Sequence, residues 1–223
     1  MATEQTGDDA LLDVLRERLY VPVVSDVLDG MGLLHQAMDE HLRPLAPEMR
    51  LIGRAHTVLT ADVYERSSDP YRLEIASVDA LKPNDVMVAS TNHSTRTCFW
   101  GELLSTAAVN RGATGCLIDG HVRDVLRIIE MDFPVFATGI RPVDSSYRSQ
   151  VIAYGVPVQV GGVRVEPGDV IFGDYDGVVV IPQGRLPEVV EAALAKVDGE
   201  NHTRDMLRQG ATLREVYDKY GVL

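Results

Sequence analysis

Two short stretches of this sequence place glycine beside charged side chains in a way that can support chemistry. They are WGELL at residues 100–104 and DGHVRD at residues 119–124. Gly101 and Gly120 allow the backbone to come close to a ligand, because glycine has no side chain. If a helix begins near Glu102, the free amides of its first turn form a site that attracts an anion such as a carboxylate.

Arg123 and Asp124 are the residues best suited to catalysis. Arg123 carries a planar, permanent positive charge that can hold the oxygen of an oxo-acid and stabilise negative charge on an enolate. Asp124 offers the kind of oxygen ligand that Mg²⁺ or Mn²⁺ prefers, and such a cation can withdraw electrons from a breaking carbon–carbon bond. A structural role is the alternative, and at this spacing the more common one, because an acidic side chain at a helix start interacts favourably with the helix dipole.

Alternating strands and helices are expected to position these two stretches. The apolar and glycine pattern predicts a strand over residues 86–89, a helix over 101–110, a strand over 115–118, a helix from about 123 and a strand over 134–137. This alternation indicates parallel strands, whose ligand sites lie beyond the carboxyl ends of the strands. If the strands are neighbours, both stretches open on the same edge of the sheet.

The flanking segments complete an α/β fold that we expect to be a single domain over residues 1–223. The expected elements are a helix capped by Asp8 or Asp9, a shorter helix from Ser25-Asp26 to Gly30, a strand over 51–63, a helix starting at Pro70, antiparallel strands over 156–181, a long helix over 186–208 and a last helix with a capping box from Thr212 to Glu215.

Composition limits the classes of protein that the chain can belong to. Hydrophobic residues make up 45% and charged residues 24% of the 223 residues, which is typical of a globular protein. The net charge of −12 disfavours nucleic-acid binding, and no apolar run is long enough for a membrane span. Cys98 and Cys116 form no C-x-x-C pair, so free thiols in a cytoplasmic protein are expected.

Longer motifs resemble a known enzyme family. WGELLSTAAVNRGATGCLIDGHVRD, in which Glu102 is followed by twenty residues and then Arg123-Asp124, closely resembles the 4-hydroxy-4-methyl-2-oxoglutarate/4-carboxy-4-hydroxy-2-oxoadipate aldolase family. VSDVLDG, GIRPVDSSYR and VQVGGVRVEPGDVIFGDYDGVVVIP are also similar to that family's patterns, so the resemblance covers nearly the whole chain. It implies the fold shared with the RraA regulators of RNase E, a layered β/β/α sandwich of the swivelling-domain type with flanking helices.

The resemblance also implies an activity and a set of roles. The family's enzymes are class II pyruvate aldolases that use a divalent metal, Mg or Mn, act on small 2-oxo-acids, and form homotrimers or homohexamers with sites between subunits. Asp124 would bind the metal, Arg123 the substrate and its enolate, and Gly101 with the amides of Leu103 and Leu104 the pyruvyl carboxylate. Glu102, and Glu200 from a neighbouring subunit, would contact the metal through water. Decarboxylation of oxaloacetate is expected through the same enolate.

Several residues depart from the family pattern or have less certain roles. His93 lies in a longer loop than relatives have, and it either donates a proton or, as we expect, faces solvent or makes a loop hydrogen bond. His121 occupies a position where relatives commonly have a small residue. Trp100 is expected to pack beside the site, and Asp174 and Asp176 to fix a hairpin through side chain to backbone bonds.

Two other functions compete with that of an aldolase. The first is a non-catalytic, RraA-like regulator of RNase E that acts by protein–protein interaction. Regulators of that branch tend to lack a carboxylate after the arginine, whereas this chain has Asp124. The second is a methyltransferase, which we discount because no glycine-rich nucleotide loop follows an early strand.

Overall fold

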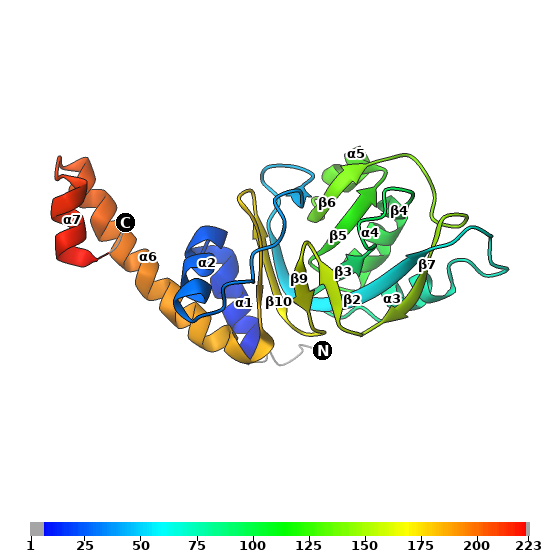
Figure 1. Ribbon diagram of the computed structural model, residues 1–223, viewed down its shortest axis with the longest axis horizontal. Helices are drawn as coiled ribbons and strands as arrows, with labels where there is room; N and C mark the ends of the chain where they lie inside the picture. Colours follow the sequence, from blue (N-terminus) through cyan, green and yellow to red (C-terminus); the bar gives the residue numbers. More distant parts are fainter. Residues whose placement is uncertain (1–6, 222–223) are drawn as a thin grey trace.

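The computed structural model describes residues 7–221, so the ends of the predicted 1–223 domain lie outside the described residues. Its helices alternate with strands along the middle of the chain and gather at both ends of it (Figure 1). The helices are α1 (Gly7–Arg18), α2 (Val21–Gly30), α3 (Arg72–Asp79), α4 (Glu102–Asn110), α5 (Val125–Glu130), the 3₁₀ turn η1 (Gln183–Arg185), α6 (Leu186–Arg208) and α7 (Leu213–Tyr220).

A mixed sheet of nine strands forms the centre of the molecule. Strand pairs β2–β3, β3–β5, β4–β5 and β5–β6 are parallel, whereas β1, β7, β10 and β11 join the sheet antiparallel. Its strands are β1 (Arg43–Pro44), β2 (Leu51–Asp62), β3 (Asp85–Ser90), β4 (Cys98–Trp100), β5 (Gly115–Val122), β6 (Val135–Ile140), β7 (Ser149–Tyr154), β10 (Val170–Asp174) and β11 (Gly177–Ile181). A separate hairpin consists of β8 (Val158–Val160) and β9 (Val163–Val165).

Three hydrophobic clusters hold the layers together. One buries α3, α4 and α5 against one face of the sheet, and a second buries the β8–β9 hairpin on the other face. The third lies where α1, α2 and the first half of α6 pack on β10 and β11. Helices, sheet and hairpin therefore form the predicted β/β/α sandwich with flanking helices.

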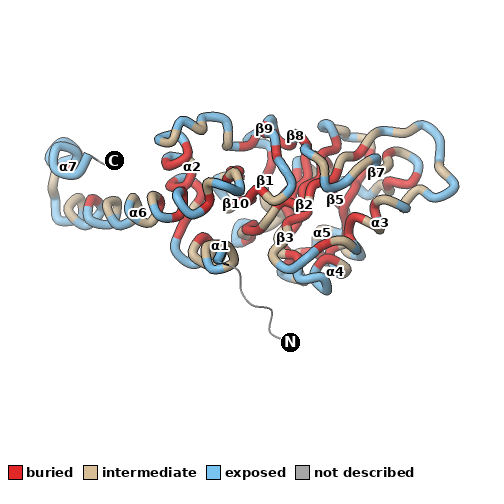
Figure 2. Tube along the Cα trace, turned by 90° about the horizontal axis from the view of Figure 1, so that it is seen from below, coloured by how far each residue is buried: buried red, intermediate tan, exposed pale blue. Residues whose placement is uncertain are grey.

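The second half of α6 extends beyond this body and carries α7 at its end (Figures 1 and 2). Val189, Val190 and Ala193 are buried in the first half, whereas Thr203 is the one buried residue later in the helix. The predicted capping box is confirmed, because Thr212 accepts a bond from the Glu215 amide and Glu215 accepts one from the Thr212 amide. Within residues 7–221, no helix is both long enough and apolar enough to cross a membrane.

Four sequence predictions need correction. Helix α2 begins at Val21, with Pro22 in its first turn, so Ser25 and Asp26 lie inside it. Asp8 and Asp9 lie in the first turn of α1. Strands β4 and β7 were not predicted, and β5 continues past Ile118 to Val122.

Cys98 and Cys116 are free, as predicted, and both are buried. Cys116 lies in the middle of the sheet on β5, and Cys98 lies on β4, where its thiol contacts the Arg141 carbonyl oxygen at 2.9 Å. Burial raises the pKa of both thiols, which disfavours the reactive thiolate. The two cysteines therefore have a structural role.

Candidate active site

A cleft of about 290 Å³ lies where the two chemically promising stretches meet. Its walls come from β4, the start of α4, the end of β5, helix α3 and the loop before β7. The lining residues are Tyr71, Glu74, Ile75, Cys98, Phe99, Trp100, Gly101, Leu103, Leu104, Arg123, Asp124, Asp144 and Ser145. Arg123 and Asp124 also border a second hollow with Ile140, Arg141 and Pro142.

Gly101 allows the two stretches to approach each other. It precedes α4 in an extended conformation, and a Cβ atom built on it would lie 2.8 Å from Asp124 Oδ2 and 3.2 Å from Arg123 Cγ. Any larger residue would therefore displace the carboxylate of Asp124. The sequence prediction that both stretches open on one edge agrees with this geometry.

Asp124 holds its carboxylate away from its own helix. It precedes α5 in the left-handed region, at φ 59 and ψ 29, and makes no side-chain cap. Its Oδ2 instead accepts a 3.3 Å hydrogen bond from the Glu102 amide and lies 3.7 Å from Arg123 Nε. A left-handed aspartate costs about 1 kcal/mol, and a side-chain cap on its own helix α5, which Asp124 does not make, does not offset that cost. The donor set of this partly exposed carboxylate, with space for water, fits Mg²⁺ or Mn²⁺.

An ion pair anchors the Arg123 guanidinium in the cleft. Arg123 Nη1 lies 3.2 Å from Asp144 Oδ1, and the Tyr71 hydroxyl donates a 2.6 Å hydrogen bond to Asp144 Oδ2. Burial acts to raise the pKa of Asp144, but the hydrogen bonds from Tyr71 and Ser146 and the charge of Arg123 outweigh it and lower the pKa to about 2. Asp144 is therefore charged at neutral pH and fixes Arg123 toward the cleft.

Glu74 is a second carboxyl group in the cleft, and the sequence analysis missed it. It is only 8% exposed, and the Ser145 hydroxyl donates a 3.2 Å hydrogen bond to its Oε2. Burial raises the pKa of Glu74 to about 7, with Asp144 acting in the same direction and Ser145 and Arg123 opposing it. A strongly shifted carboxyl group in a cleft is typical of functional sites. Its position one turn before Val78, on the buried face of α3, was the available signal.

The other predicted site residues occupy different places. Leu103 and Leu104 line the cleft at the start of α4, whereas the Glu102 carboxylate accepts a 2.9 Å bond from Thr106. Glu200 lies on α6, which is at the opposite end of the molecule from α4 and α5 (Figure 1). There it accepts a hydrogen bond from Tyr20. Within one chain Glu200 therefore does not approach Asp124, and its role from a neighbouring subunit stays a prediction.

The remaining predictions agree in part with the structure. Trp100 is buried beside the cleft and donates a 2.8 Å bond to Ser105, as expected for packing. Asp174 fixes the β10–β11 turn by accepting from the Asp176 amide at 2.9 Å, while Asp176 contributes only its backbone. His93 and His121 lie outside the cleft and line a separate pocket, so neither faces the Arg123 site.

Comparison with known proteins places this architecture in a family. The model of the RraA-like family, described as Aldolase/RraA, matches residues 21–180. The chain belongs to the RraA-like family. This match includes both stretches of the cleft, and it confirms the resemblance found in the sequence.

Relatives of this RraA-like protein carry different names. A protein of Halalkalibacterium halodurans named "Putative 4-hydroxy-4-methyl-2-oxoglutarate aldolase" is 30% identical over 94% of this chain and 96% of its own length. Protein DlpA of Legionella pneumophila is 31% identical over 88% of this chain, but the match spans only 32% of DlpA. Streptomyces coelicolor RraAS2, described as an unusual member of the RNase ES inhibitor RraA family, is 28% identical, with a TM-score of 0.79 over 88% of this chain and 98% of its own.

Proposed function

We propose that this RraA-like protein is a divalent-metal-dependent lyase of the class II aldolase type. It cleaves a 4-hydroxy-2-oxo-dicarboxylic acid to pyruvate and a second oxo-acid, and it decarboxylates oxaloacetate by the same chemistry. The observation that carries the proposal is the position of the Asp124 carboxylate. It does not cap its own helix, and it lies beside Arg123 where Gly101 leaves room for it. The name of the Halalkalibacterium halodurans relative supports the same class of reaction.

Asp124 is the proposed direct ligand of the metal, Mg²⁺ or Mn²⁺. Glu102, and Glu200 of a neighbouring subunit, would act through bound water. When bound, the cation would draw electron density from the 2-oxo group of the substrate, which weakens the bond between C3 and C4. The fit rests on the partly exposed Asp124 carboxylate, which does not cap its own helix, and on the glycine that leaves space for it.

Arg123 binds the 2-oxo-acid and stabilises the negative charge that develops on the 2-oxo oxygen when the bond breaks. A guanidinium suits this role because its charge is permanent and its planar fork can contact two oxygens. The ion pair to Asp144, itself held by Tyr71, keeps the group oriented before substrate arrives. The amides of Leu103 and Leu104 at the start of α4 receive the substrate carboxylate.

The proposed assembly is a homotrimer or a homohexamer. Glu200 can contribute to a site only from a second copy, because α6 and the cleft lie at opposite ends of one chain (Figure 1). The projecting half of α6 would deliver it. Light scattering coupled to size-exclusion chromatography measures this state directly, and a monomer with full activity would contradict the shared site.

The proposed activity is tested by pyruvate release from 4-hydroxy-4-methyl-2-oxoglutarate and oxaloacetate, with Mg²⁺ or Mn²⁺ and with chelator. We expect chelator to abolish release, Asp124→Asn to remove the metal-dependent rate, and Arg123→Lys to lower kcat about 100-fold. Asp205→Asn and Arg127→Lys are matched controls, since both residues are exposed and lie outside the cleft. Undiminished release by Asp124→Asn would refute the proposal.

An RNase regulator is the second candidate, and the similarity to Streptomyces coelicolor RraAS2 favours it. Such a protein would act by contact with the ribonuclease and would need no metal. Adding the purified chain to an RNase E cleavage assay separates the two functions. Inhibition at equimolar amounts, together with absent pyruvate release, would favour the regulator over the enzyme.

A further inference from the structure

Arg123 and Asp124 border two separate spaces. The first is the cleft of about 290 Å³, and the second is the hollow of about 380 Å³ that they line with Ile140, Arg141 and Pro142. We call the second space the Arg141 hollow. Arg123 and Asp124 are the lining residues that the two spaces share. A substrate bound at these two residues can therefore place one half in the cleft and the other half in the Arg141 hollow.

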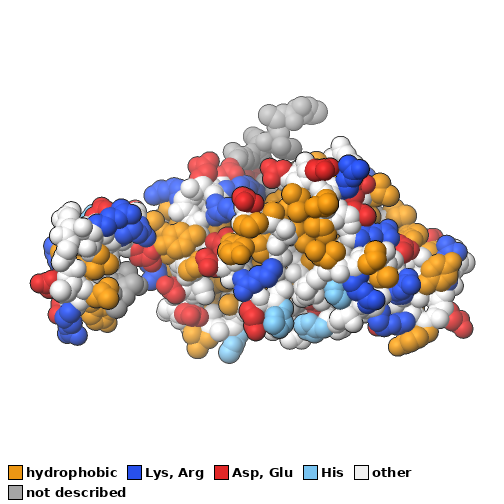
Figure 3. Space-filling model, turned by 90° about the horizontal axis from the view of Figure 1, so that it is seen from above, with side chains coloured by type: hydrophobic (Ala, Val, Ile, Leu, Met, Phe, Trp, Pro, Cys, Tyr) orange, Lys and Arg blue, Asp and Glu red, His pale blue; other side chains and the backbone are white. Residues whose placement is uncertain are grey.

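The two spaces differ in charge. The chain as a whole carries a net charge of −12, so a dianion binds only where basic groups face it. Lys and Arg side chains gather on the right of the face shown in Figure 3, at the end of the molecule that carries β4 and β7 in Figure 1. The cleft is unsuited to a second carboxylate, because Asp144 is charged there and Glu74 is a further carboxyl group. In the Arg141 hollow the acidic lining residue is Asp124, which is the proposed metal ligand.

Neighbouring parallel strands place Arg141 next to Arg123. Strands β5 and β6 pair at Val122 and Ile140, so the residues that follow them lie at the same edge of the sheet. The Arg141 amide donates a 3.0 Å hydrogen bond to the Val122 carbonyl oxygen, which holds the two strand ends together. Burial raises the pKa of the Cys98 thiol, and the charges of Arg123 and Arg141 both oppose this. Both guanidinium groups are therefore close to Cys98 on β4.

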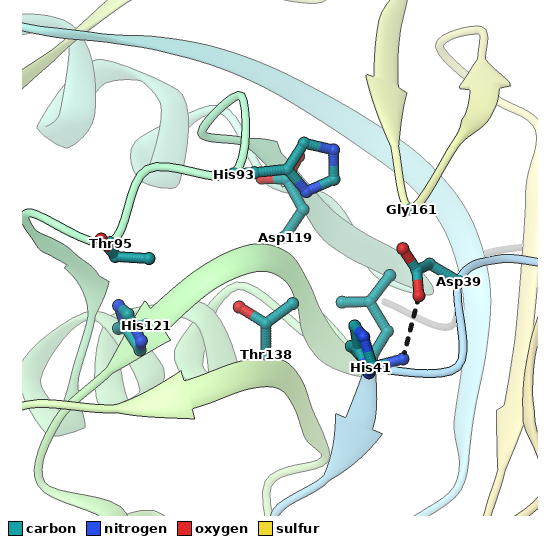
Figure 4. A pocket seen from close by; sticks show the side chains of 9 residues that line it. Asp39, His41, His93, Thr95, Asp119, His121, Thr138 and Gly161 are labelled. Carbon is teal, nitrogen blue, oxygen red and sulfur yellow. Dashed lines mark hydrogen bonds between the residues drawn. The ribbon is translucent and has the colours of Figure 1, made fainter.

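One contact orients the Arg141 side chain and leaves its other N–H groups available. Its Nη1 donates a hydrogen bond to the Thr95 carbonyl oxygen, on the loop between β3 and β4. Thr95 and His121 line a neighbouring pocket (Figure 4), and burial together with the charge of Arg141 lowers the pKa of His121. Within the described part of the chain, no carboxylate forms an ion pair with Arg141, whereas Arg123 pairs with Asp144. Arg141 can therefore bind an anion in the hollow.

We propose that Arg141 binds the second carboxylate, at C5, of a 2-oxo-dicarboxylic substrate whose pyruvyl half lies in the cleft. This inference rests on the proposed function and names the residue that selects dicarboxylic acids. The bond between C3 and C4 then lies beside Arg123 and Asp124, where the two spaces meet. Ile140 and Pro142 contact the carbon atoms of the distal half. Because Arg141 touches the substrate away from the breaking bond, it governs affinity and selectivity.

Calorimetric binding of two 2-oxo-acids that lack the 4-hydroxyl group, with Mg²⁺ present, tests this role without turnover. 2-Oxoglutarate and 2-oxopentanoate have the same number of carbon atoms, and C5 is a carboxylate in the first and a methyl group in the second. We expect the wild type to bind 2-oxoglutarate more tightly. In Arg141→Gln the ratio of the two affinities should fall about tenfold, which is the lower end for a charge-assisted hydrogen bond because Arg141 is exposed.

Two further variants separate charge from structure. Arg141→Lys keeps the positive charge and should retain part of the selectivity, although it lacks the planar fork. Arg127→Gln is the matched control, because Arg127 is exposed on α5 and lines neither space, so its affinity ratio should equal that of the wild type. Glutamine at position 141 keeps a side-chain N–H group that can still donate to the Thr95 carbonyl oxygen, and circular dichroism checks that each variant is folded.

Pyruvate release separates this inference from the proposed function. With 4-hydroxy-2-oxoglutarate and 4-hydroxy-2-oxopentanoate as substrates, Arg141→Gln should lower the ratio of the two kcat/KM values about tenfold. If the wild type releases no pyruvate but its preference for 2-oxoglutarate depends on Arg141, the aldolase proposal fails and the carboxylate site stands. Equal weakening of both 2-oxo-acids in Arg141→Gln, an unchanged affinity ratio, or a wild type that binds neither acid would overturn the inference.

Discussion

Replacing Glu74 with glutamine should make this protein more stable at alkaline pH than the wild type. Burial raises the pKa of Glu74 from 4.5 to about 7 in the folded chain. Between these values the folded state keeps a proton that the unfolded state has released, so the free energy of unfolding falls as pH rises. Glutamine has the same shape and no charge at any pH, so the free energy of unfolding of the variant does not fall in this way.

The expected effect is large because Glu74 is well shielded. At 8% exposure, solvent screens its charge little. Each tenfold change in proton affinity corresponds to about 1.4 kcal/mol. From about pH 5 to about pH 8, the wild type should therefore lose about 2.5 kcal/mol of unfolding free energy relative to Glu74→Gln.

Urea unfolding followed by circular dichroism at a series of pH values measures this difference. Chelator should be present throughout, so that no cation at Asp124 changes the charge near Glu74. Glu130→Gln is the control, because Glu130 is exposed on α5. If the free energies of unfolding of wild type and Glu74→Gln differed by the same amount at every pH in this range, the reasoning would be refuted. It would also be refuted if Glu130→Gln showed the same pH-dependent increase in the free energy of unfolding.

Three further predictions follow from individual contacts. Gly101→Ala should reduce metal-dependent pyruvate release about 100-fold with little change in Tm, because the new Cβ would lie 2.8 Å from Asp124 Oδ2; an unchanged rate would contradict the close approach. Asp144→Asn should lower kcat/KM about tenfold by releasing Arg123. The pKa of Asp144 is lowered to about 2, so the wild type, but not this variant, should lose the stabilisation from this carboxylate as the pH falls from 3.8 toward 2, which acid unfolding measures. Thr212→Ala should cost α7 about 1 kcal/mol, seen as faster amide exchange in that helix alone.

Local patterns predicted the regular middle of the fold well. Between residues 82 and 140, short apolar runs alternate with segments whose apolar residues recur at helical spacing. Each strand or helix there is stabilised by burial of its apolar face. Strands β4 and β7 were missed because Cys98–Trp100 is very short and Ser149–Tyr154 follows a polar loop. Their pairing with β5 and β2 depends on partners distant in the sequence, which no local pattern contains.

The candidate site divides in the same way. Gly101, Arg123 and Asp124 could be found because their residue types and spacing suggest chemistry. Glu74 was missed, because a glutamate in a helix usually faces solvent even where its spacing matches the apolar face. Its burial arises from the loop that holds Ser145, about seventy residues later in the chain. Contacts at that separation are set by the tertiary fold.

The two buried thiols can report how the folded protein opens locally. Cys116 is enclosed by the central strands, whereas Cys98 lies in the wall of the cleft. A thiol reagent in solution can modify Cys98 only when the cleft wall separates, and Cys116 only when the sheet itself parts. Because the chain has two cysteines, their labelling rates report these two motions separately, with no engineered residue.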